Sequence, residues 1–66
     1  MATEGITLSA FLKWAGIAPT GGTAKRMIED GAVLVNGVVE RRRGRQLRDG
    51  DRVYIGSDEF VVRYEP

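Results

Sequence analysis

The apolar residues near the start of the chain recur at helical spacing. They occupy positions i, i+3, i+4 and i+7 and are Leu8, Phe11, Leu12 and Ala15. Thr7 precedes this face as a suitable N-cap, and Gly16 follows it where a left-handed residue commonly ends a helix. Because Pro19 disfavours a resumption, the pattern predicts one helix that begins after Thr7 and ends near Gly16.

A second, shorter helix is predicted after a Thr-Gly-Gly loop. Its apolar face consists of Ala24, Met27 and Ile28, and Gly31 ends it. The other side carries Lys25, Arg26 and Glu29.

After Gly31 the period changes from helical to alternating. Val33 and Val35 face one way, and Val38-Val39 returns as a partner strand. Asn36-Gly37 lies between these strands, and both residues tolerate the positive φ angles of a type I′ hairpin turn.

The last third of the chain predicts a second hairpin. Asp49-Gly50 is a turn signal, and Asp at such positions is typical of turn chemistry rather than of a metal site. Val53 and Ile55 then alternate as a strand, and Gly56-Ser57-Asp58 turns the chain. A final strand is predicted from the alternation of Phe60, Val62 and Tyr64. The prediction is a single α+β domain over residues 1–66, with two helices packed on one face of a small, curved antiparallel sheet of about four strands.

Composition excludes several classes of function. The 66 residues include no Cys and no His, so disulfides, thiolate metal sites and the commonest general base are absent. Without a nucleophile–base pair we expect no enzyme, no cofactor, no metal and no small-molecule substrate. The N-terminus does not have the pattern of a signal peptide, and no apolar run reaches the roughly 20 residues of a membrane span. We therefore expect a soluble, monomeric, cytoplasmic protein.

The net charge of +1 conceals an uneven distribution. Residues 1–12 carry −1; residues 13–48 hold eight cations and three acids, which is +5; residues 49–66 hold two cations and five acids, which is −3. A basic middle and an acidic end predict one positive face.

Most of the positive charge lies in one stretch, which we call the arginine segment (residues 41–48). It contains Arg41, Arg42, Arg43, Arg45 and Arg48, with Glu40 as the one acid between Asp30 and Asp49. Guanidinium groups match phosphate oxygens bidentately and stay charged at any relevant pH. The sequence thus favours a polyanionic partner, and a solvated charge run is the alternative.

The second helix and Trp14 offer further candidate contacts for such a partner. Lys25 and Arg26 lie near the predicted start of the second helix, where Thr20 and Thr23 could add hydroxyl donors. Lys25 and Glu29, however, also form an ordinary i, i+4 surface pair. Trp14 could stack on a base, but its position predicts packing at the edge of the core.

The motifs in this chain resemble those of the S4, or alpha-L, RNA-binding domain family, especially its small stand-alone bacterial members. The hairpin region Gly31-x-Val33-x-Val35-Asn36-Gly37 matches the family's G-x-V-x-V-N-G signature. The later Leu47-x-x-Gly50-Asp51-x-Val53 matches its closing L-x-x-G-D-x-[VI]. The resemblance covers about three-quarters of the chain and includes Leu12, Gly16, Thr20, Ala24 and Ile28 in the helical part.

This resemblance implies binding to structured RNA, usually ribosomal or transfer RNA, through the helical pair and the loop that follows the hairpin. The implied RNA-binding residues are Lys13, Thr20, Lys25, Arg26, Arg41, Arg42, Arg43, Arg45 and Arg48. The family often begins its second helix with Ser-Arg, where this chain has Thr20-Gly21, so more of the contact is expected from the arginine segment.

The working hypothesis is a non-catalytic module that binds phosphates of a folded RNA through one basic face. One rival is a protein-interaction module in which the same basic face binds an acidic protein partner, or the hydrophobic edge around Trp14 binds a partner. A second rival, binding of double-stranded DNA, is disfavoured because the second helix lacks a row of base-reading residues.

Overall fold

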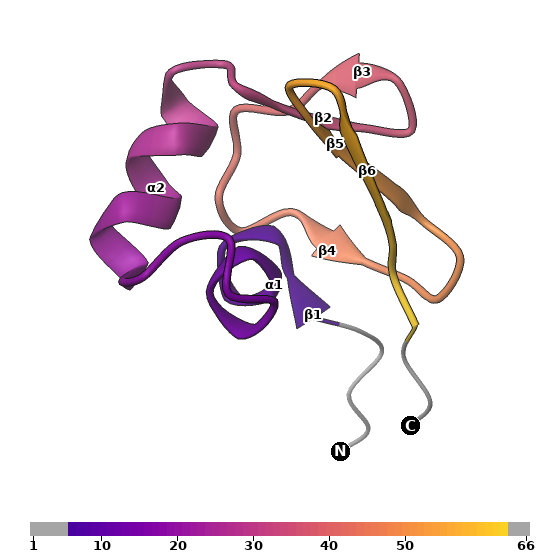
Figure 1. Cartoon of the computed structure of the whole chain (residues 1–66), viewed down its shortest axis with the longest axis horizontal. Coiled ribbons are helices and arrows are strands. Elements are labelled where there is room, and N and C mark those ends of the chain that lie inside the picture. The colour runs from indigo at the N-terminus through magenta and orange to yellow at the C-terminus, as the bar shows by residue number, and fades with distance from the viewer. Residues whose placement is uncertain (1–5, 64–66) are drawn as a thin grey trace.

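A computed structural model of the chain describes residues 6–63 and confirms the α+β class (Figure 1). In chain order the elements are β1 (Ile6–Thr7), α1 (Leu8–Trp14), α2 (Gly21–Glu29), β2 (Val33–Val35), β3 (Val38–Val39), β4 (Gln46–Leu47), β5 (Arg52–Ile55) and β6 (Asp58–Val61). Strands β3, β2, β5 and β6 form an antiparallel sheet in that order. The two short strands β1 and β4 form a separate antiparallel pair, which the sequence did not predict.

The cap of α1 is as predicted. Thr7 Oγ1 accepts a hydrogen bond from the Ala10 N–H at 3.3 Å, and Gly16 follows the helix with φ of +79°. Ala15, however, does not belong to the buried face. The helix ends at Trp14, and Ala15 is the exposed C-cap residue.

The predicted start and relative length of the second helix are wrong. Thr20 is itself the N-cap, because its Oγ1 accepts a hydrogen bond from the Thr23 N–H at 3.1 Å. Gly21 and Gly22 therefore lie inside the first turn rather than in a loop. With nine residues against seven, α2 is the longer of the two described helices.

The hairpin of β2 and β3 turns at Asn36-Gly37 as predicted. Both residues have positive φ, at 55° and 87°, which a type I′ turn requires. The second hairpin differs slightly from the prediction, because the turn consists of Gly56-Ser57 and Asp58 already belongs to β6. The last strand was predicted from the alternation of Phe60, Val62 and Tyr64, but β6 ends at Val61, before Val62. Tyr64 lies outside the described residues.

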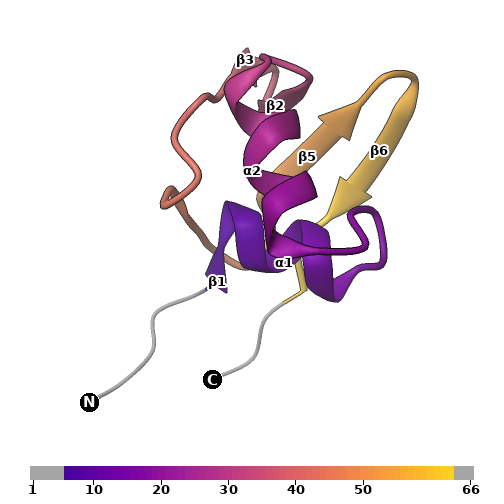
Figure 2. The ribbon, with the colours of Figure 1, turned by 90° about the vertical axis from the view of Figure 1, so that its left-hand side faces the viewer.

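One hydrophobic core joins the helices to both sheets. Its buried members are Leu8, Phe11, Leu12, Ala18, Ala24, Ile28, Val33, Val35, Leu47, Val53 and Val62. Viewed from the helical side, α2 lies in front of β2 and β5 (Figure 2). The alternation of β2, with Val33 and Val35 buried and Leu34 half-buried, directs the inner face of the sheet toward the helices. Neither described helix has the length and apolar character needed to cross a membrane.

Candidate nucleic-acid interface

The backbone of the arginine segment is attached to α1. The N–H of Leu8 donates to the Arg45 carbonyl at 2.8 Å, and the N–H of Ser9 donates to the Arg43 carbonyl at 3.2 Å. The first N–H groups of a helix have no partner within it, so the arginine segment supplies acceptors that α1 would otherwise lack. This connection fixes the segment at the start of α1.

Within the segment the chain makes a tight turn. The Arg45 N–H donates to the Arg42 carbonyl at 3.1 Å, which places Arg43 and Gly44 at the tip of the turn. Just before the segment, the Glu40 N–H donates to the Val33 carbonyl at 3.0 Å and so connects it to β2.

The Glu40 side chain is buried, and arginines surround its carboxylate. Oε1 accepts from Arg45 Nη1 at 2.6 Å, and Oε2 accepts from Arg42 Nε at 3.0 Å and from the Arg42 backbone N–H at 3.1 Å. These bonds, first from Arg42 and then from Arg45, lower the pKa of Glu40 from 4.5 to about 2. The carboxylate therefore stays ionised at any physiological pH.

Arg41 turns back to the end of α2. Its Nη1 donates to the Glu29 carbonyl at 3.0 Å, one of the last carbonyls of the helix, where a cation is favoured by the helix dipole. The guanidinium lies over Gly31, where a Cβ would come within 2.8 Å of Arg41 Nη2. Gly31 thus combines a positive φ of +81° with space for this side chain.

The remaining two arginines of the segment are exposed. Arg43 is at the tip of the turn, and Arg48 lies beyond β4. The Arg48 backbone N–H donates to Asp51 Oδ2 at 2.8 Å, which fixes the main chain at that position. No ion pair between described residues includes either guanidinium group.

These contacts give the five arginines of the segment different surroundings. Arg42 and Arg45 share one buried carboxylate, and the Arg45 side chain is only 33% exposed. Arg42 keeps 77% of its side chain exposed although it pairs with Glu40. The sequence analysis missed the role of Glu40; its signal was a single acid directly before a run of arginines.

The helical residues predicted to contact RNA have different surroundings. Lys13 is exposed in the last turn of α1, and Lys25 and Arg26 are exposed on α2. The expected Lys25–Glu29 pair is not among the ion pairs of the described part of the chain. Thr20 serves as the cap of α2, and its hydroxyl also hydrogen-bonds that of Thr23 at 3.1 Å.

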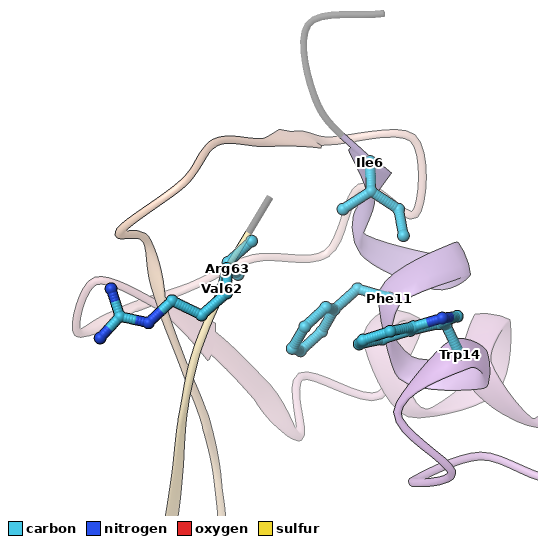
Figure 3. A pocket seen from close by; sticks show the side chains of 5 residues that line it. All are labelled: Ile6, Phe11, Trp14, Val62 and Arg63. Atoms are coloured by element: carbon cyan, nitrogen blue, oxygen red, sulfur yellow. The ribbon is translucent and has the colours of Figure 1, made fainter. Parts of the chain in front are cut away.

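Trp14 is more exposed than predicted. Its side chain contacts Phe11, with ring centroids 6.5 Å apart, but the residue is 76% exposed because the helix ends there. Together with Ile6, Val62 and Arg63, the two rings line a shallow apolar pocket of about 220 Å³ (Figure 3). In Figure 3 the Arg63 guanidinium points away from both rings.

Comparison with known proteins agrees with the geometry. The family model for the S4 domain matches residues 1–63. The chain belongs to the S4 domain family. This S4 domain is also 49% identical over 61 residues to the probable ribosome maturation protein RlbA of Bacillus subtilis (strain 168). That alignment covers 91% of this chain and 86% of RlbA. The resemblance noted in the sequence is thereby confirmed, and S4 domains typically bind RNA.

Proposed function

We propose that this S4-family protein binds structured ribosomal RNA, without catalysis, as part of ribosome maturation in the cytoplasm. The observation that carries the proposal is the arginine segment: a turn fixed to α1, β2 and α2 by hydrogen bonds and exposing Arg42, Arg43 and Arg48. The name of the relative RlbA, a probable ribosome maturation protein, supports the ribosomal target. Transfer RNA remains the second target to be tested.

We divide the predicted contacts into two groups. Arg43 and Arg48 bind phosphates directly, and Arg42 reaches RNA with the exposed part of its guanidinium while it stays bonded to Glu40. Arg41, Arg45 and Thr20 mainly hold the surface in shape, since each already has a hydrogen-bond partner within the fold. Additional contacts are expected from the exposed cations of the two helices, which are Lys13, Lys25 and Arg26.

The chemistry of this surface favours recognition of shape rather than sequence. Guanidinium groups on a turn match phosphates that protrude from an RNA helix, bulge or junction. About five phosphate contacts would give a slope of log K against log salt near −3.5 to −4.5. We expect weak sequence preference and loss of binding at high salt.

The experiment compares two charge-reversed variants in a gel-shift assay with labelled ribosomal RNA fragments and, separately, bulk transfer RNA. Replacing both Arg43 and Arg48 by Glu removes exposed side chains without breaking a side-chain bond between described residues. The control is Arg63→Glu, an exposed arginine beyond β6. The RNA affinity of the double variant should fall at least tenfold. The affinity of the control should fall only by the small amount expected from its change in net charge.

The alternative function, binding of a protein partner, predicts a different outcome. An RNA-binding protein purified at low salt should carry absorbance near 260 nm that ribonuclease or high salt removes. A protein with no salt-dependent affinity for either RNA would refute the proposal. Equal affinities for the double variant and the wild type would instead refute the choice of surface.

A further inference from the structure

Glu40 is the one charged side chain among the described residues that is buried, with 7% of the residue exposed. Burying a carboxylate is unfavourable unless it is paired and hydrogen-bonded. Here both carboxylate oxygens accept bonds from arginines, and within the described residues no buried side-chain polar atom lacks a partner. The cost of burial is thus offset by contacts with the residues on the proposed RNA surface.

The geometry of these contacts determines the shape of the turn. Glu40 Oε2 accepts both the backbone N–H and Nε of Arg42, and Oε1 accepts Nη1 of Arg45. The carboxylate therefore bridges two residues on either side of Arg43 and Gly44. If the carboxylate were removed, the turn would be closed, among the described residues, by the hydrogen bond from the Arg45 N–H to the Arg42 carbonyl alone.

Two effects of Glu40 on RNA binding oppose each other. Its negative charge weakens attraction to phosphate, but the guanidinium groups of Arg42 and Arg45 that bond the carboxylate offset that charge. Its bonds keep the turn and two arginine side chains ordered before RNA arrives, so less conformational entropy is lost on binding. For two long side chains the second effect is the larger one, because each immobilised side chain weakens association severalfold.

We propose that Glu40 is a positioning residue for RNA binding: by bridging Arg42 and Arg45 it fixes the turn that presents Arg43, so that an acid within the basic surface increases the affinity for RNA. The inference rests on the proposed function above. It predicts that a substitution that makes the protein more positive weakens its binding to a polyanion.

The test is Glu40→Gln, which keeps the size of the side chain and removes its charge. Asp58→Asn is the matched control, because Asp58 is exposed at the start of β6 and its substitution changes the net charge equally. Affinities for labelled ribosomal RNA fragments are measured at several salt concentrations, well below the melting temperature of each variant. We expect roughly tenfold weaker binding for Glu40→Gln and equal or slightly tighter binding for Asp58→Asn.

A second measurement separates positioning from general stability. Amide hydrogen exchange should become faster at Arg42 and Arg45 in Glu40→Gln, while the core strands β2 and β5 keep their protection. Glu40→Asp retains the charge but shortens the reach, so it should bind with intermediate affinity. It also provides the decisive comparison if Glu40→Gln does not fold.

The outcomes distinguish this inference from the proposed function. Absence of salt-dependent RNA binding by the wild type refutes the proposed function itself. Salt-dependent binding by the wild type, with equal or tighter binding by folded Glu40→Gln, refutes the positioning role alone. If Glu40→Gln is unfolded, wild-type affinity in Glu40→Asp refutes that role in the same way.

Discussion

Gly16 and Gly31 end the two described helices in the same way but have different surroundings. Each follows the C-cap residue, with φ of +79° and +81°. At Gly16 an added Cβ would meet nothing within 4 Å, whereas at Gly31 it would lie 2.8 Å from Arg41 Nη2. Substitution of each glycine by Ala therefore separates the backbone effect from the effect on Arg41.

The expected magnitudes follow from these two effects. An L-residue in the left-handed region costs about 1–2 kcal/mol, partly offset by about 0.4–1 kcal/mol from the less flexible unfolded chain. Gly16→Ala should thus lower the free energy of unfolding by about 1 kcal/mol. Gly31→Ala must also displace the Arg41 guanidinium, which then loses its 3.0 Å bond to the Glu29 carbonyl. That bond is worth about 1 kcal/mol at an exposed site, so the total should be about 2 kcal/mol.

The assay is urea denaturation of Gly16→Ala, Gly31→Ala, Arg41→Ala and the Gly31→Ala/Arg41→Ala double variant. The last three form a double-mutant cycle with the wild type. In a domain of this size, 1 kcal/mol corresponds to roughly 4–8 °C in melting temperature, so the difference is measurable by thermal denaturation as well. The excess cost at Gly31 should vanish when Arg41 is already Ala. If Gly16→Ala and Gly31→Ala are equally destabilised, or if the excess persists without Arg41, the inferred contact between Arg41 and α2 is refuted.

Three other predictions concern the buried Glu40, the start of α2 and the exposed Trp14. The lowered pKa of Glu40 means that its stabilisation is fully present above pH 4.5 and is lost as the pH falls toward about 2. Because solvent around Arg42 weakens the pairing, the free energy of unfolding should fall by only about 1–2 kcal/mol. Denaturation measured over this pH range should show the fall in the wild type, and Glu40→Gln should lack it. Gly21→Arg places a cation at the start of α2, where a Cβ meets no atom within 4 Å; RNA affinity should rise severalfold relative to Gly21→Ala in the gel-shift assay. Trp14→Ala should lower the unfolding free energy by about 1 kcal/mol or less, because the residue is 76% exposed; a loss of about 3–5 kcal/mol, typical of a buried Trp, would contradict the structure.

The local elements were predictable because their signals are local. The spacing of Leu8, Phe11 and Leu12 predicted α1, and Asn36-Gly37 predicted the hairpin and its positive φ angles. The errors concern the ends of elements. Position 15 fits the helical face by spacing but falls after the last turn, and Thr20 starts α2 earlier than the two glycines suggested.

Pairs distant in the sequence were not predictable in the same way. The pairing of Ile6 with Leu47 joins the first and fourth strands, each too short to show an alternating pattern. Contacts of this kind within the candidate site are seen only in the folded structure. One of them is the hydrogen bond from Arg41 to the end of α2. The exposure of Trp14 likewise depended on where the helix ended.

The sequence by itself determined the α+β class and the position of a basic segment, because periodicity, turn residues and charge are properties of neighbouring residues. It also indicated the family, through short motifs that resemble those of the S4 domain. Only the tertiary structure decided what each arginine does. Arg42 and Arg45 bond Glu40, Arg41 contacts α2, and Arg43 is exposed at the tip of the turn. The five identical side chains differ in role because the fold gives them different surroundings: two share Glu40, one bonds the end of α2 and two are exposed. Such contacts depend on distance in space rather than along the chain.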